Sequence, residues 1–154
     1  MPSIKYNEIF SSFYLKAESY DILNLKSTQV NEFLNGWLCS SLSKPYIRRL
    51  FSNFKIDNEI QIISYEMKYS TDEEYDKNFV IDIAAIGMVI EWITPKINSL
   101  TNILQMYGSK EEKFYSQKNH LDGLKDLKAS LLREQKGLIR DRGYIWNTYL
   151  DGNK

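Results

Sequence analysis

Apolar residues recur along most of this chain with the spacing of helix faces, and one segment is apolar on almost every side. Residues 79–93 are all apolar except for three positions, which are Asp82, Gly87 and Glu91. A helix of this kind is buried in a core, crosses a membrane or forms part of an assembly interface. A membrane span needs about 20 apolar residues, whereas the longest uncharged run here covers only residues 83–90. The pattern therefore predicts a central core helix and excludes a membrane span.

Three shorter helices are predicted in the first half of the chain. Apolar side chains three and four positions apart predict a first helix over residues 3–16. A second amphipathic pattern predicts a helix over residues 27–42, which opens with a serine and a threonine that both suit an N-cap. Similar spacing over residues 46–54 predicts a third helix, with Pro45 in its first turn.

One segment changes from the helical period to a period of two, which predicts a β-strand within residues 59–69. Its alternating apolar positions are Ile63, Tyr65, Met67 and Tyr69. A single strand leaves its backbone donors and acceptors unpaired, so it needs a partner. The other β-rich segment is Tyr144–Leu150, and we expect the strand to pair with this segment or with another subunit.

The second half of the chain predicts two long antiparallel helices joined by the loop GSKEEKFY. The first begins near residue 76 and covers about residues 77–107, with either a kink or a restart at Pro95. The second covers about residues 117–141, with Ser116 as its N-cap. The predicted fold class is therefore mainly α: a helical bundle built on this pair, with a short β element near residues 59–69 and an extended C-terminal tail.

The second long helix carries an apolar face that is interrupted by polar residues. The face consists of Leu121, Leu124, Leu127, Leu131, Leu132, Leu138 and Ile139. Lys128 and Gln135 lie within the same arc, which predicts that this edge meets solvent, a channel or a polar partner. The residues that we expect to pack in the core are Met88, Trp92, Pro95, Leu124 and Leu131.

Length and composition indicate a single domain without strong electrostatic targeting. The 154 residues fit one domain of ordinary size, assigned to residues 1–143, followed by a tail of residues 144–154. Twenty basic and twenty acidic residues cancel, so the net charge draws the chain neither to nucleic acid nor to an anionic membrane. The lone Cys39 excludes an internal disulfide framework. Charged residues interrupt the first sixteen positions, so we expect no signal peptide.

Candidate catalytic and metal-binding groups are few, and they do not form a recognisable motif. Cys39 and the single histidine, His120, are far apart in sequence, which disfavours a Cys–His nucleophile pair. His120 has no ligand-type residue three or four positions away, so zinc spacing is missing. The seven glycines form neither a dinucleotide fingerprint nor a phosphate loop. We therefore expect a protein without enzymatic activity, cofactor or metal.

Basic residues near Pro45 permit a DNA-binding interpretation. Two helices flanking Pro45, with Arg48 and Arg49 on the second and a strand after it, are compatible with a winged helix-turn-helix. A recognition helix offers several polar side chains to base edges, however, and residues 46–54 are mostly apolar. A DNA-binding regulator is therefore kept as the alternative function.

Three stretches of the chain occur in a characteristic order: FYLKAESYDILNLKSTQVNEFLNGWL, GMVIEWITPKINS and KEEKFYSQKNHL. Together they resemble the small helical head-to-tail connector proteins, also called neck or adaptor proteins, of tailed bacteriophages. The resemblance spans most of the chain. It implies a structural virion protein in the neck, made in the host cytoplasm, which forms a homo-oligomeric ring beneath the portal, bridges the capsid to the tail and bounds the DNA channel.

The resemblance also implies partners. These are the portal protein, other neck or tail proteins, and further copies of the chain in a ring that we expect to be a dodecamer, with only non-specific contact to passing DNA. Aromatic residues at a chain end tend to be buried against a partner, so the tail is expected to dock on the portal or a neighbouring subunit. The expected docking residues are Tyr144, Ile145, Trp146, Tyr149 and Leu150. Another neck or tail-completion protein fits the same features.

Overall fold

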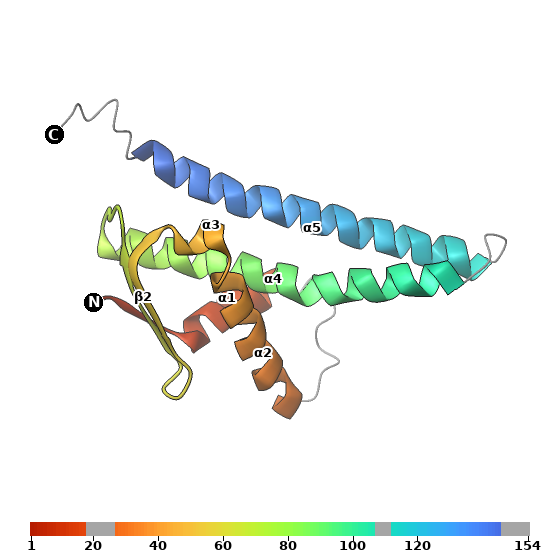
Figure 1. Ribbon diagram of the computed structural model, residues 1–154, viewed down its shortest axis with the longest axis horizontal. Coiled ribbons are helices and arrows are strands. Elements are labelled where there is room, and N and C mark those ends of the chain that lie inside the picture. Colours follow the sequence, from red (N-terminus) through yellow and green to blue (C-terminus); the bar gives the residue numbers. More distant parts are fainter. Residues whose placement is uncertain (18–26, 107–111, 146–154) are drawn as a thin grey trace.

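The protein is a mainly helical molecule with a small sheet at one end of a long helix pair (Figure 1). The computed structural model describes residues 1–17, 27–106 and 112–145. Its elements in chain order are β1 (Ser3–Lys5), α1 (Tyr6–Ala17), α2 (Ser27–Leu42), α3 (Pro45–Arg48), β2 (Phe51–Asp57), β3 (Ile62–Met67), α4 (Glu73–Met106) and α5 (Glu112–Ile145). The expected fold class, with its long helix pair and short β element, is confirmed.

The sheet has the strand order β1-β3-β2, and both pairings are antiparallel. The period of two correctly predicted β3, which is the central strand. The expected pairing of this strand with Tyr144–Leu150 is wrong, because β1 and β2 occupy its two edges with Ile63 opposite both Ile4 and Ile56. β1 has only three residues, so it is too short to give a periodic signal of its own. The helix expected over residues 3–16 therefore begins only at Tyr6.

The third predicted helix is mostly a strand. Only Pro45–Arg48 is helical, and β2 begins at Phe51. The reason is a register shift between Phe51 and Asn53, where β2 carries an extra residue relative to β3. This irregularity lets Phe51 and Phe54, three positions apart, share one side of the strand, with their ring centroids 4.8 Å apart. A spacing of three is thus produced here by a bulged strand and not by a helix.

α4 is the central core helix that the apolar segment predicted. α4 contacts α1, α2 and α5, and its residues between Phe79 and Ile93 share one core cluster with buried residues of the sheet. Many of them are inaccessible to solvent, including Val80, Ala84 and Met88. The helix continues through Pro95 without a break and changes direction near its middle (Figure 1). The hydroxyl of Thr94 donates a hydrogen bond of 2.7 Å to the carbonyl of Ile90 in this region.

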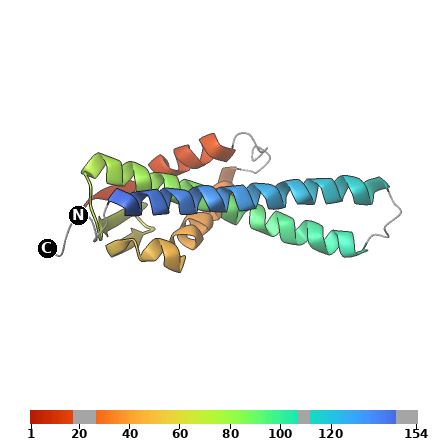
Figure 2. The same cartoon turned by 90° about the horizontal axis from the view of Figure 1, so that it is seen from above.

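α5 runs antiparallel along α4 over most of its length (Figure 2). It is longer than expected: it begins at Glu112, so Ser116 lies inside the helix and is not its N-cap. It also continues through Ile145, beyond the expected boundary between domain and tail. None of the described helices is both long and apolar enough to cross a membrane. The distal part of the pair, residues 97–106 and 112–127, extends beyond the other elements, and we call it the arm (Figure 1).

Candidate functional site

A buried polar cluster fixes the C-terminal end of α5 to the start of α4. Arg142 is only 5% exposed, and its Nη2 donates hydrogen bonds of 2.6 Å to both Asp76 Oδ1 and the carbonyl of Tyr69. Asp76 also accepts hydrogen bonds from the hydroxyl of Ser70 at 2.6 Å and from the backbone N–H of Thr71 at 3.3 Å. The cluster therefore connects α5, α4 and the turn that follows β3.

The charges in this cluster stabilise each other. Burial alone raises the pKa of Asp76, but the hydrogen bonds from Ser70 and Arg142 outweigh burial, so the pKa is lowered and the carboxylate stays ionised. The guanidinium of Arg142 also lies 4.7 Å from the ring centroid of Phe79 and 5.4 Å from that of Tyr75. In the sequence, Asp76 belongs to an acidic run that indicates a solvated turn, and no local pattern connects it with a residue 66 positions away.

A second polar residue of α5 is buried and paired within the chain. Gln135 is 1% exposed; its Nε2 donates to the carbonyl of Ile83 at 2.8 Å, and its Oε1 accepts from the hydroxyl of Tyr46 at 2.9 Å. Of the expected surroundings, solvent is wrong for Gln135 because the side chain is buried, and the polar partner is found within the same chain, on α3 and α4. Lys128, the other polar residue in that arc, is half-buried.

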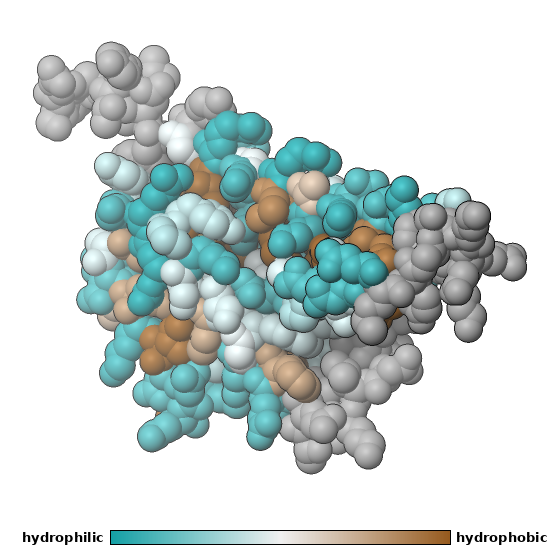
Figure 3. All heavy atoms as spheres, turned by 45° about the vertical axis from the view of Figure 1, so that its right-hand side comes forward, coloured by the Kyte–Doolittle hydropathy of each residue, from teal (hydrophilic) through white to brown (hydrophobic). Residues whose placement is uncertain are grey.

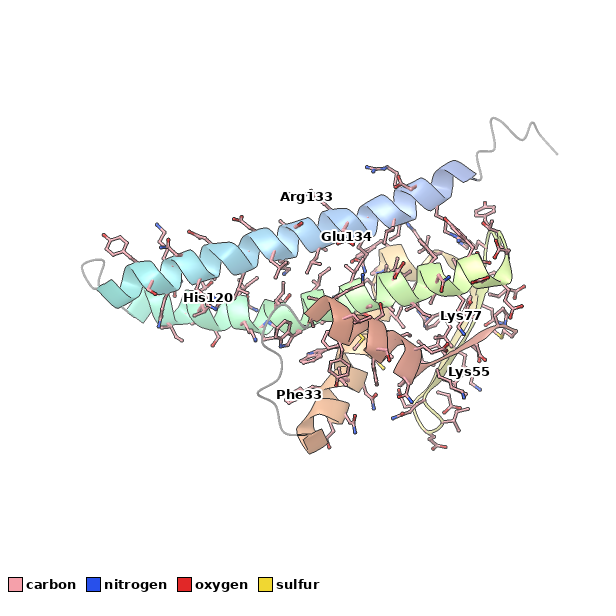
Figure 4. All side chains as sticks on the ribbon, turned by 180° about the vertical axis from the view of Figure 1, so that it is seen from behind. Phe33, Lys55, Lys77, His120, Arg133 and Glu134 are labelled. Atoms are coloured by element: carbon pink, nitrogen blue, oxygen red, sulfur yellow. The ribbon has the colours of Figure 1, made fainter. Side chains whose placement is uncertain are left out.

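Aromatic residues are exposed where α1 and α2 meet. Tyr14 is 42% exposed and Phe33 is 48% exposed. The ring of Phe33 stacks on that of half-buried Trp37, with centroids 5.8 Å apart, and buried Phe13 contacts both Trp37 and Tyr14. Phe33 lies on the side of the molecule away from α5 (Figure 4). We call Tyr14, Phe33 and Trp37 the α1–α2 patch.

The arm is a second apolar surface on different elements. Of the described elements only α4 and α5 contribute to it, and Leu127 is the one residue of the arm that packs against the core cluster. Ile97 and Leu121 are buried between them, whereas the other apolar positions stay partly accessible: Leu100, Ile103, Leu104, Leu124 and Leu127. Figure 3 shows apolar residues at the surface of the arm, beside the grey residues. We call these five residues the arm seam.

The residues expected in the core have different environments. Met88, Trp92 and Leu131 are buried, and Leu124 is half-buried in the arm. The assignment of Pro95 to the core is wrong: Pro95 is exposed, because the inward positions of this turn are taken by its neighbours Ile93 and Ile97.

The expected docking residues lie at or beyond the end of the described chain. Tyr144 and Ile145 form the last backbone positions of α5. Trp146, Tyr149 and Leu150 lie outside the described residues. The tail therefore stays a prediction.

The candidate reactive groups are not assembled into a catalytic arrangement in the described part of the chain. The Sγ of Cys39 lies 3.7 Å from Asn58 Oδ1, which also accepts a hydrogen bond of 2.5 Å from the hydroxyl of Tyr6. Burial raises the pKa of the Cys39 thiol, so the reactive thiolate is disfavoured. His120 is exposed on α5 (Figure 4). Among the described residues, no three His, Cys, Asp or Glu side chains are grouped to hold a metal ion.

No protein-family model, no curated protein and no solved structure matches this chain. The features of this chain that can indicate a function are therefore the α1–α2 patch, the arm seam and the polar residues at the end of α5.

Proposed function

We propose that the protein is a structural subunit of the virion neck of a tailed bacteriophage, a head-to-tail connector that forms a ring under the portal and bridges the capsid to the tail. The observation that carries this proposal is the presence of two different apolar surfaces, the α1–α2 patch and the arm seam, on separate elements. In the described part of the chain, both surfaces are more exposed to solvent than the core is.

Two unlike surfaces suit a head-to-tail contact between copies. A two-fold dimer uses one self-complementary surface, whereas a closed ring joins one surface of each subunit to a different surface of the next. In the proposed ring, the arm of one subunit packs on the α1–α2 patch of its neighbour. Aromatic residues such as Phe33 and Trp37 are typical of the centre of such interfaces.

The balanced charge supports a position around the DNA exit channel. A wall that neutralised many phosphates would bind DNA tightly, because counterion release favours each added contact. Twenty basic and twenty acidic residues avoid a strong net attraction, so passing DNA makes only non-specific contacts. The alternative of a winged-helix regulator has less support, because α3 is a single turn of four residues and Arg48 lies over the ring of Phe54, with its Cζ 4.2 Å from the centroid.

The oligomeric state of the purified protein tests the proposed ring directly. We expect light scattering and negative-stain electron microscopy to reveal rings, either of the protein alone or after addition of the purified portal protein, since a template can drive assembly. Phe33→Ser in the patch and Leu104→Ser in the arm seam are expected to prevent ring formation. Ile60→Ser is the matched control, because Ile60 is 64% exposed but belongs to neither surface. A chain that stays monomeric with portal present, or that binds DNA as a monomer, refutes the proposal.

The tail is tested separately. Removing residues 146–154 leaves the last helical residue, Ile145, in place. We expect this deletion to abolish binding to the portal while the far-UV circular dichroism stays unchanged. Retention of portal binding would show that the tail is not the docking segment, without contradicting ring formation.

A further inference from the structure

A cavity of about 310 Å³ lies where the end of α5 meets the turn after α3 and the end of β3. Its basic side chains come from three separate segments: Arg49 follows α3, Lys68 follows β3, and Arg142 lies on α5. Its less polar walls are formed by Leu50, Tyr69 and Ile139. The cavity therefore combines positive charge with apolar surface, and none of the described residues that line it is acidic.

The positive charge of this cavity is only partly compensated. Arg142 is paired with Asp76. Arg49 and Lys68 are exposed, and neither forms an ion pair within the described part of the chain. Of the three basic groups, Arg142 alone therefore has a carboxylate partner within the described part of the chain.

Arg142 also has unused hydrogen-bonding capacity. Its Nη1 is buried and has no hydrogen-bond partner among the described residues, although its Nη2 has two acceptors. Buried polar groups are nearly always paired, and an incompletely paired buried guanidinium is costly. An acceptor on a bound ligand beside Arg142 would give Nη1 the hydrogen-bond partner that it lacks in the described part of the chain.

We propose that this cavity binds a carboxylate carried on an apolar body, as presented by an acidic residue next to an aliphatic one in a peptide segment of a partner protein. A carboxylate is a planar acceptor whose two oxygens match the donors of a guanidinium, and Lys68 adds a second, flexible donor. Leu50 and Ile139 favour the apolar body. Duplex DNA fits less well, because its phosphates lie on a convex rod and have no apolar group to fill the cavity. This proposal does not depend on the neck assignment.

Titration of the full-length ¹⁵N-labelled protein, followed by NMR, tests the proposal. The probe is N-acetyl-Leu-Asp-amide, and its neutral control is N-acetyl-Leu-Asn-amide. We expect the acidic probe to shift the amide signals of Lys68 and Gly143, which line the cavity, and to bind at least threefold more tightly than the neutral probe. Arg49→Gln and Lys68→Gln are each expected to weaken binding about twofold to fivefold, since exposed ion pairs contribute little individually.

The control variant is Lys55→Gln, because Lys55 is an exposed cation on β2 that does not line the cavity (Figure 4). It should bind the acidic probe as the unmodified protein does. Arg142 is left intact because its loss would disturb the fold. The proposal is overturned if neither probe shifts these signals, if both probes bind equally, or if Lys55→Gln weakens binding as much as Lys68→Gln. Tighter binding of inorganic phosphate or of a short DNA duplex at the same signals would also overturn it in favour of a phosphate site.

Discussion

Gly87 permits the close approach of α4 to α2 and α5, and replacing it with alanine tests the packing at the centre of the molecule. A Cβ atom at this position would lie 2.7 Å from the Cβ of Ser41 on α2 and 3.1 Å from the Nε2 of Gln135 on α5. A Cβ–Cβ distance of 2.7 Å is well inside van der Waals contact, so one of the helices has to move. Ser41 is buried and its Cβ is next to the backbone, so it has little freedom to yield.

The expected change in the free energy of unfolding of Gly87→Ala follows from two opposing effects. Alanine is favoured over glycine within a helix by about 1 kcal/mol. Extra volume in a packed core costs about 1–3 kcal/mol. Gly36→Ala is the matched control, because Gly36 lies on a helix and a Cβ there would meet nothing within 4 Å. We therefore expect Gly36→Ala to stabilise the protein by about 1 kcal/mol, and Gly87→Ala to be less stable than Gly36→Ala by about 1–3 kcal/mol.

Urea unfolding followed by far-UV circular dichroism measures both variants. A double-mutant cycle with Ser41→Gly identifies the contact, because removing the Cβ of Ser41 should recover most of the penalty of Gly87→Ala. Equal stability of Gly87→Ala and Gly36→Ala would refute the close approach of α2 and α4. A penalty that Ser41→Gly does not relieve would locate the clash elsewhere.

Three further predictions concern the buried polar groups. Arg142→Met should lower the free energy of unfolding in urea by about 3–5 kcal/mol, because it leaves the Asp76 carboxylate without its charged partner. Adding Asp76→Leu should recover much of this loss. If the costs of the two substitutions simply add, the pairing is contradicted. The lowered pKa of Asp76 means that its carboxylate stabilises the fold fully above its unfolded pKa of about 3.9, and that this contribution is lost as the pH falls through the lower folded pKa. The advantage of the unmodified protein over Asp76→Asn should accordingly be constant near neutral pH and shrink below about pH 4; a pH-independent difference would contradict this linkage. Gln135→Leu should cost about 1–3 kcal/mol by leaving the Tyr46 hydroxyl and the Ile83 carbonyl without their partner, and Gln135→Glu should cost at least as much, because it buries a carboxylate against the Ile83 carbonyl; a Gln135→Glu variant as stable as the unmodified protein would contradict the assigned hydrogen bonds.

Local periodicity was enough to predict the elements whose pattern spans several turns. The bounds of α2, the central position of α4, the antiparallel pair of α4 and α5 and the strand β3 all follow from spacing, because a long element repeats its buried positions many times. Short or irregular elements gave no such repeat. β1 has three residues, and the extra residue in β2 gave Phe51 and Phe54 a helix-like spacing, so both strands were assigned to helices.

The candidate sites depended on contacts between residues distant in sequence. The high aromatic content and the lack of a catalytic motif were visible in the sequence, because they are properties of residue type. The pairing of Asp76 with Arg142, the burial of Gln135 and the grouping of Arg49, Lys68 and Arg142 around one cavity were decided only when the chain folded. An isolated charge in a linear pattern indicates solvent. Whether it instead pairs with a residue of another element depends on how the helices and strands pack. The spacing of residues within one element does not contain this information.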